Sequence, residues 1–247
     1  MIYILLPCYN ELENLKKIIK KTNKLSSIGS NKIKIIIVND GSSDQTKNYI
    51  IKLKKKSNSK ILYLEHKNNM GLNVALYTGL NFFLKIARKK DILVSLDSDN
   101  THPISLIPRM ISLIENGNYD VVIASRFQNG SNIQGLSLFR IILSKGARIL
   151  FKFYFPIKNV EDYTCNFRAY KYLVLKKSDL IKKKFFLSKD FSIIADLLIN
   201  LNKKIKMIKI KEVPLKLRYD YKIGNSKLNI YTNILKTFLL IFRNIFY

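Results

Sequence analysis

The sequence predicts an α/β protein with a mostly parallel sheet flanked by helices. Short β-rich runs alternate with helix-length segments through the first half of the chain, a pattern typical of parallel strands joined by helical crossovers. Polar residues directly follow several of these runs, where open α/β sheets bind their ligands. The chain has 247 residues, of which 47% are hydrophobic, so it can bury one substantial core.

Five apolar runs rich in β-branched residues are the predicted strands. They span residues 2–6, 33–38, 61–64, 92–96 and 121–124. The segments between them are long enough for helices. Because parallel strands present their carboxyl ends at one edge of the sheet, we expect the polar residues that follow them to meet there.

Two carboxylates one residue apart follow the fourth of these strands. Asp97-Ser98-Asp99 ends the apolar run 92–96, and hard divalent cations such as Mg²⁺ or Mn²⁺ prefer carboxylates together with substrate phosphates. The alternative is structural, because the same residues can form an Asx turn before a helix that starts after Pro103. The spacing thus predicts a metal site or a turn.

A second acidic turn follows the second strand. Asn39-Asp40-Gly41-Ser42 is placed to accept hydrogen bonds from a nucleobase or a ribose. Asp44 is also a good helix N-cap, so this turn can serve structure, binding or both.

Motifs over nearly the whole chain, taken in order, carry a family resemblance. They are LPCYNE at 6–11, VNDGSSDQT at 38–46, NMGLNVA at 69–75, DSDNTHP at 97–103, ASR at 124–126, RIILSKGA at 140–147, DYTCNFRAY at 162–170 and EVPLKLRYDYKIGNSK at 212–227. The chain resembles inverting family 2 glycosyltransferases of the GT-A fold, in particular their dolichyl- or polyprenyl-phosphate sugar synthase branch. Each motif is weak alone, and their order gives the resemblance its specificity.

The resemblance implies a donor site for a nucleotide-sugar. Its candidate residues are Pro7, Tyr9, Asn10, Glu11, Asn39, Asp40, Gly71, Asn73, Asp97 and Ser98. Asp97 and Asp99 inherit the metal-binding role, with Thr101 as a candidate third ligand. Asn39 and Thr101 depart from the Asp and Gln common in relatives, which affects base recognition and metal preference.

The resemblance also implies an acceptor phosphate site in the second half of the chain. Arg126, Arg140 and Ser144 match its core, and the basic tail adds Arg218, Lys222 and Lys227. The planar guanidinium of Arg suits bidentate phosphate binding. The alternative for each Arg is a surface position or a pair with a nearby carboxylate.

The residues favour a phosphate acceptor over a sugar hydroxyl. A hydroxyl usually needs a general base, whereas a phosphate monoester, with a second pKa near about 6, is already largely a dianion at neutral pH. Together with the family resemblance, this implies transfer of a hexose, of mannose or glucose type, from GDP or UDP to a polyprenyl phosphate with inversion. Transfer to a hydroxyl of a glycan or glycolipid is the alternative, with Asp190 as its reserve base.

Charge and two amphipathic segments indicate an anionic membrane surface as a partner. The chain has 44 Lys and Arg against 17 Asp and Glu, a net charge of +27; a lysine-biased composition is the alternative explanation. Residues 138–157 and 228–247 place basic and apolar side chains on opposite faces of a helix, as interfacial helices do. The charge alone also suggests nucleic-acid binding, but aromatic residues are not interleaved with the lysine runs as stacking requires, so we expect no nucleic-acid partner.

We expect one catalytic domain and a peripheral location at the cytoplasmic face of the membrane. Residues 1–125 are the predicted nucleotide-sugar half and 126–227 the acceptor half of the domain. Residues 228–247 are a predicted membrane-associated amphipathic helix. The start of the chain does not resemble a signal peptide, and its apolar runs are too short to span a bilayer. A membrane-protein partner or a homo-oligomer are other routes to the membrane.

Overall fold

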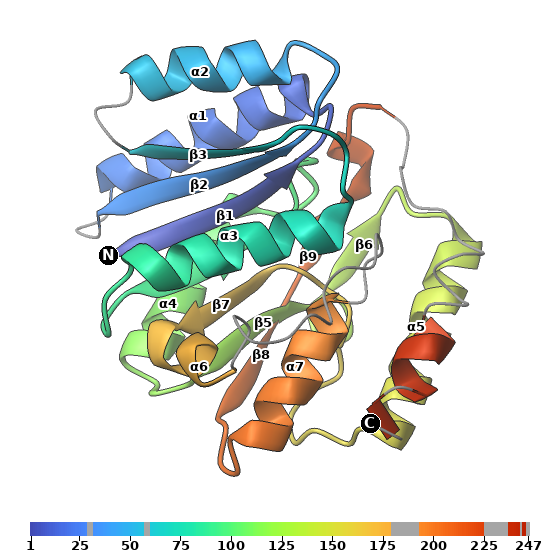
Figure 1. Cartoon of the computed structure of the whole chain (residues 1–247). Coiled ribbons are helices and arrows are strands. Elements are labelled where there is room, and N and C mark those ends of the chain that lie inside the picture. The colour runs from blue at the N-terminus through green and yellow to red at the C-terminus, as the bar shows by residue number, and fades with distance from the viewer. Residues whose placement is uncertain (29–31, 57–59, 179–192, 225–236, 243, 246–247) are drawn as a thin grey trace.

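A seven-stranded mixed sheet forms the centre of the molecule. The computed structural model describes residues 1–28, 32–56, 60–178, 193–224, 237–242 and 244–245. Within them the sheet has the strand order β3-β2-β1-β4-β7-β5-β8, with helices covering both faces (Figure 1). The predicted α/β class with a mostly parallel sheet is confirmed.

The five predicted strands are all present. The main sheet consists of β1 (Ile2–Cys8), β2 (Ile33–Asp40), β3 (Ile61–His66), β4 (Ile92–Ser95), β5 (Val121–Ser125), β7 (Arg168–Lys171) and β8 (Ile210–Pro214). β1 pairs in parallel with both β2 and β4. The carboxyl ends of these three strands therefore lie side by side and bring their following loops together.

Two strands of the main sheet, β7 and β8, were not predicted, and β7 breaks the parallel order. It lies between β4 and β5 and is antiparallel to both. Its four residues, RAYK, contain an Arg and are too few for a clear alternating pattern. A second, two-stranded sheet pairs β6 (Asn132–Gln134) with β9 (Lys216–Arg218), which joins the start of the acceptor half to the basic tail.

Seven helices precede the C-terminal segment in the described part of the chain, and all of them except α5 cover the sheet (Figure 1). They are α1 (Leu12–Ile28), α2 (Thr46–Lys56), α3 (Leu72–Ile86), α4 (Ile107–Glu115), α5 (Leu138–Tyr154), α6 (Tyr172–Lys177) and α7 (Ile193–Lys204). Successive residues of β1 point to opposite faces: Tyr3 and Leu5 pack into a core with α3, α6 and α7. Ile4 and Leu6 pack into a second core with α1 and α4. The sheet is thus buried on both sides, as its continuous apolar strands require.

Helix α5 lies apart from the sheet and beside the C-terminal segment. Residues 237–242 and 244–245 are helical and run alongside α5 (Figure 1). The rest of the predicted helix 228–247 lies outside the described residues. In the part of the chain that the structure describes, no helix has the length and apolar character needed to span a membrane.

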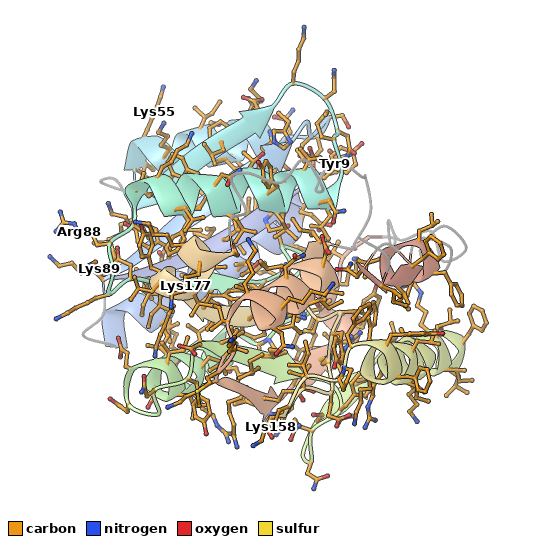
Figure 2. The ribbon with its side chains drawn as sticks, turned by 60° about the horizontal axis from the view of Figure 1, so that its bottom comes forward. Tyr9, Lys55, Arg88, Lys89, Lys158 and Lys177 are labelled. Atoms are coloured by element: carbon orange, nitrogen blue, oxygen red, sulfur yellow. The ribbon has the colours of Figure 1, made fainter. Side chains whose placement is uncertain are left out.

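Basic side chains are spread over several faces of the molecule. Lys55, Lys89, Lys158 and Lys177 project outward from separate elements (Figure 2), and all four are exposed. This distribution is typical of solvated lysines.

Candidate active site

The strand-end loops and α5 enclose one large cavity of about 910 Å³. It is lined by most of the predicted site residues: Pro7, Tyr9, Glu11, Asp40, Gly71, Asp97, Ser98, Asp99, Thr101, Arg126, Arg140, Ser144 and Lys222. Tyr9 lies near the N-terminal end of α3 (Figure 2). Asn10, Asn39, Asn73 and Arg218 do not line the cavity, and Lys227 lies outside the described residues.

The Asp97-Ser98-Asp99 turn is fixed at the end of β4. Ser98 donates a hydrogen bond of 2.5 Å to the carbonyl of Pro7 at the end of β1, which joins the two strand ends. Asn100 follows with a φ of 64°, a left-handed conformation that Asn tolerates well. The turn thereby directs both carboxylates into the cavity.

One oxygen of each carboxylate accepts hydrogen bonds from a neighbouring residue of the protein. Asp97 Oδ1 accepts from Asn166 Nδ2 at 3.0 Å. Asp99 Oδ1 accepts from the backbone N–H and the hydroxyl of Thr101 at 3.2 and 2.7 Å. Thr101 therefore supports Asp99 directly, and its role as a third metal ligand stays a prediction.

The two carboxylates have pKa values shifted in opposite directions. Burial, opposed by nearby His102, raises the pKa of Asp97 above its ordinary value. Burial alone would also raise the pKa of Asp99, but the charge of Lys222 holds it below its ordinary value. Two close acids in different surroundings commonly separate in this way.

The donor set fits a hard divalent cation that shares its shell with phosphate. Among the described residues no cluster of three or more His, Cys, Asp or Glu side chains is suited to a metal. Asp97 and Asp99 do converge on one cavity, and one or two carboxylates completed by substrate phosphates are the usual protein ligands of Mg²⁺.

Asp40 organises the loop that passes beneath the cavity. Its carboxylate accepts from His66 Nδ1 at 2.6 Å and from the backbone N–H groups of Met70 and Gly71 at 2.9 and 2.8 Å. Gly71 has a φ of 90°, where a side chain would be strained. Asp40 thus positions the 69–71 loop, and any contact with a nucleotide would be additional.

Asn10 ties the first strand-end loop to the second. Its side-chain oxygen accepts from the backbone N–H of Ser43 at 2.8 Å, and its own N–H donates to the Ser42 hydroxyl at 2.9 Å. Asn39, which is buried, accepts from the N–H of Ser42 at 3.2 Å. Both asparagines therefore shape the donor end of the cavity from behind its wall.

Arg126 is paired with a buried carboxylate. Its Nε and Nη2 donate to Asp162 Oδ2 and Oδ1 at 2.8 and 2.7 Å, and Asp162 is fully buried. Burial would raise the pKa of Asp162, but Arg126 holds it below the ordinary value. Arg126 therefore pairs with a nearby carboxylate, which was the alternative to phosphate binding. Because Arg126 also lines the cavity, its role at the acceptor phosphate stays a prediction.

Arg140 and Ser144 lie one helical turn apart on α5 and face the cavity. Arg140 donates to the hydroxyl of Tyr219 at 3.0 Å and forms no ion pair with any described carboxylate. The Ser144 hydroxyl is buried and has no hydrogen-bond partner among the described residues. An unpaired guanidinium beside an unsatisfied hydroxyl suits an anion.

The basic tail divides into two arrangements. Arg218 pairs with Asp220 at 2.6 Å and does not enter the cavity, whereas Lys222 donates to Asp99 Oδ2 at 2.9 Å. The structure therefore brings Lys222 to a carboxylate that is predicted to bind the metal, and its role at the acceptor phosphate stays a prediction.

Sequence reasoning gave no role to two residues that prove central. Asn166 holds Asp97 and is itself held by the Ser95 hydroxyl at 2.8 Å; Asp162 anchors Arg126. Both belong to the DYTCNFRAY motif, so that motif was the signal. Asn73, predicted to bind the nucleotide, accepts from the N–H of Ile193 at 3.0 Å, which ties α3 to α7; its contact with the nucleotide stays a prediction.

A family model for glycosyl transferase family 2 matches residues 3–182, the part of the chain that carries these strand-end loops and α5. The chain belongs to this family. The predicted family is thereby confirmed.

Two curated relatives are enzymes named for lipid-phosphate sugar transfer. The polyprenol monophosphomannose synthase of Mycolicibacterium smegmatis is 28% identical over 177 residues, 72% of this chain and 64% of that protein. The dolichol-phosphate mannosyltransferase of Pyrococcus furiosus is 29% identical over 213 residues, 85% of this chain and 54% of that protein. The chain therefore spans less than two thirds of the length of these relatives.

Solved structures confirm the GT-A-like fold. Glucosyl-3-phosphoglycerate synthase from Mycobacterium tuberculosis, in complex with Mn²⁺, UDP and glucosyl-3-phosphoglycerate, has a TM-score of 0.63 at 18% identity, covering 99% of this chain and 77% of that chain. The same enzyme with Mg²⁺ and UDP has a TM-score of 0.66 at 18% identity, covering 98% and 79%. Those complexes contain a divalent metal and a nucleotide.

Proposed function

We propose that this chain transfers a hexose, of mannose or glucose type, from a GDP- or UDP-sugar to a polyprenyl phosphate with inversion. One observation carries the proposal: a single cavity joins the Asp97 and Asp99 carboxylates to Arg140 and Ser144 on α5. The names of the two curated relatives support the same acceptor class.

Asp97 and Asp99 are the proposed ligands of Mg²⁺ or Mn²⁺ at the donor end. A cation bound there would stabilise the negative charge that develops on the departing nucleoside diphosphate. Asn166 and Thr101 keep the two carboxylates in place. Tyr9, Glu11 and the Gly71 loop are proposed to contact the nucleotide.

Arg140 and Ser144 are the proposed ligands of the acceptor phosphate. Docking of a phosphate would give the Ser144 hydroxyl the partner that it lacks among the described residues. It would also give Arg140 a charge-assisted hydrogen bond inside the cavity. Both groups belong to α5.

Each acid that lines the described cavity already accepts a hydrogen bond from the protein, which supports a reaction without a general base. Glu11 accepts from Asn14, Asp40 from His66, and Asp99 from Lys222, while Asp97 accepts from Asn166. Asp190 lies outside the described residues. A phosphate dianion needs no base: its oxygen attacks the anomeric carbon, the bond to the donor diphosphate breaks, and no proton moves.

Helix α5 supports peripheral attachment at the cytoplasmic face of a membrane. Its large apolar side chains point outward: Leu138, Phe139, Ile142, Ile149 and Phe153 are 56–79% exposed. Phe238, Leu239 and Phe242 in the neighbouring C-terminal helix are 53–59% exposed. An ordinary packing helix buries such residues, whereas an interfacial helix inserts them among lipid headgroups. A membrane-protein partner or a second copy of the chain are other occupants of this face.

The test is an acceptor comparison with purified protein and liposomes. Liposomes contain polyprenyl phosphate, the unphosphorylated polyprenol or a glycolipid, and labelled GDP- and UDP-sugars are offered with Mg²⁺ or Mn²⁺. We expect a mild-acid-labile lipid-linked sugar only with polyprenyl phosphate. An acid-stable product on the glycolipid would support the hydroxyl alternative and contradict the proposal.

Substitution of the metal-binding carboxylates provides the control for that assay. Asp97→Ala and Asp99→Ala are expected to abolish turnover, because each removes one of only two protein carboxylates proposed to hold the cation. Turnover retained in both variants would remove the metal assignment while leaving the acceptor assignment to be judged by the product.

A further inference from the structure

A lysine occupies the position on Asp99 where a metal ion would be expected to bind. Lys222 Nζ lies 2.9 Å from Asp99 Oδ2, and the two side chains are only 11% and 12% exposed. Thr101 holds the other oxygen of Asp99. The ammonium therefore takes the oxygen of Asp99 that is left to face a ligand.

The segment that carries Lys222 is anchored on both sides of the cavity. Asn14 on α1 accepts from the N–H of Ile223 at 3.2 Å and donates to its carbonyl at 3.0 Å. On the opposite side the Tyr219 hydroxyl accepts from Arg140 at 3.0 Å, and Arg218 donates its backbone N–H to Thr101 at 3.0 Å. These hydrogen bonds on either side of Lys222 therefore hold its backbone in a position from which the side chain reaches Asp99.

An ammonium and a divalent cation compete for the same carboxylate oxygen. A metal ion that bound alone would have to break this largely buried ion pair and leave Lys222 beside two positive charges. A nucleoside diphosphate changes the balance, because its oxygens offer Lys222 a new anionic partner within the same cavity. The cation and the diphosphate would then support each other.

We propose that Lys222 is a positioning residue that makes metal binding at Asp97 and Asp99 depend on the donor diphosphate. Without the donor, Lys222 pairs with Asp99. With the donor bound, Lys222 pairs with the diphosphate instead, and Asp99 is free to bind the cation. This inference rests on the proposed use of a nucleotide-sugar. It goes beyond it by assigning Lys222 to the donor end of the cavity and by predicting the order of binding.

The test measures Mn²⁺ binding without any sugar transfer. Mn²⁺ is titrated into wild type and Lys222→Met, alone and with UDP or GDP, and free Mn²⁺ is followed by its EPR signal. Protein-free titrations correct for Mn²⁺ bound by the nucleotide itself. In wild type we expect weak binding of Mn²⁺ alone and a large increase in affinity with nucleotide.

Lys222→Met should bind Mn²⁺ alone at least about tenfold more tightly than wild type, because the competing charge is gone. The enhancement by nucleotide should fall by a similar factor, since coupling between two ligands is reciprocal. Lys222→Arg should retain coupling, and Lys222→Gln serves if the Met variant is unstable. Lys16→Met, which removes a lysine paired with Glu13 at 2.7 Å, controls for net charge.

Two outcomes separate this inference from the proposed function. If wild type binds nucleotide with Mn²⁺ but Lys222→Met and Lys222→Gln bind Mn²⁺ alone as wild type does, the inference is wrong and the donor site stands. If wild type binds neither nucleotide in the presence of Mn²⁺, the proposed donor itself is contradicted.

Discussion

The two arginines that line the cavity differ in the partners that they already have within the protein. Arg126 is held by the buried Asp162, whereas among the described residues Arg140 contacts the ring and hydroxyl of Tyr219 and pairs with no carboxylate. A guanidinium with a carboxylate partner contributes chiefly to structure, and one without such a partner is available to an anionic ligand. This contrast predicts different consequences for removing each pair.

Arg140→Ala should weaken acceptor use far more than donor binding. Loss of a charge-assisted hydrogen bond costs about 1.5–3 kcal/mol, so we expect KM for polyprenyl phosphate to rise by roughly 10- to 100-fold. Separate titrations of acceptor and donor check this. The matched control is Arg148→Ala, which removes another arginine of α5, one that pairs with Glu161 in the loop after the helix. Equal losses for both substrates would contradict the acceptor role of Arg140.

Asp162→Asn should destabilise the fold by about 3–5 kcal/mol, because it leaves Arg126 buried without its counterion. The effect depends on pH. Although burial would raise it, Arg126 holds the pKa of Asp162 below the ordinary 3.8. The stabilisation is therefore complete above that pH and is lost as the pH falls below it toward the folded-state pKa.

Denaturant unfolding of wild type and Asp162→Asn at neutral and acid pH checks that dependence. The difference in free energy of unfolding should shrink below about pH 4. Asp220→Asn, which removes the exposed partner of Arg218, should cause a much smaller change. A constant difference across the acid range would show that the ion pair is not the source of the effect.

At the scale of elements, α5 presents different side chains on two faces. Arg148 and Lys152 turn toward Glu161 of the following loop, and Ser144 faces the cavity. Leu138, Phe139, Ile149 and Phe153 are exposed, whereas Phe151 is buried. The amphipathic pattern was visible in the sequence, but only the tertiary position of the helix reveals that its apolar face is the exposed one.

Replacing three exposed apolar residues of α5 should weaken liposome binding. Ile142→Ser, Ile149→Ser and Phe153→Ser together remove side chains that each contribute about 1.5–3 kcal/mol when fully buried, so partial insertion predicts a loss of roughly tenfold or more. Sedimentation with anionic vesicles checks this. Ile86→Ser, Leu173→Ser and Met207→Ser, at exposed apolar positions elsewhere, form the control; equal losses in both sets would contradict an interfacial role for α5.

At the scale of the whole molecule, local patterns predicted the strands whose apolar runs are continuous. They also predicted that Asp97 and Asp99 meet the loops after β1 and β2, because parallel strands end at one edge. They did not predict β7, whose short sequence acquires its place through long-range pairing with β4 and β5.

The partners of the site residues also could not be predicted from local sequence patterns. Lys222 meets Asp99 across 123 positions of sequence, and Asn166 meets Asp97 across 69. The motifs identified all four residues, but only the fold assigns each pair. For the same reason the contact of Lys222, predicted at the acceptor phosphate, with Asp99 could not be predicted from the sequence.

The central claim is that the sugar is placed on a phosphate carried by a lipid. Phosphorus NMR of the extracted acceptor during turnover tests it most directly. The monoester signal of polyprenyl phosphate should decrease while a phosphodiester signal grows in proportion to the sugar transferred. Sugar transfer with the monoester signal unchanged would contradict the account.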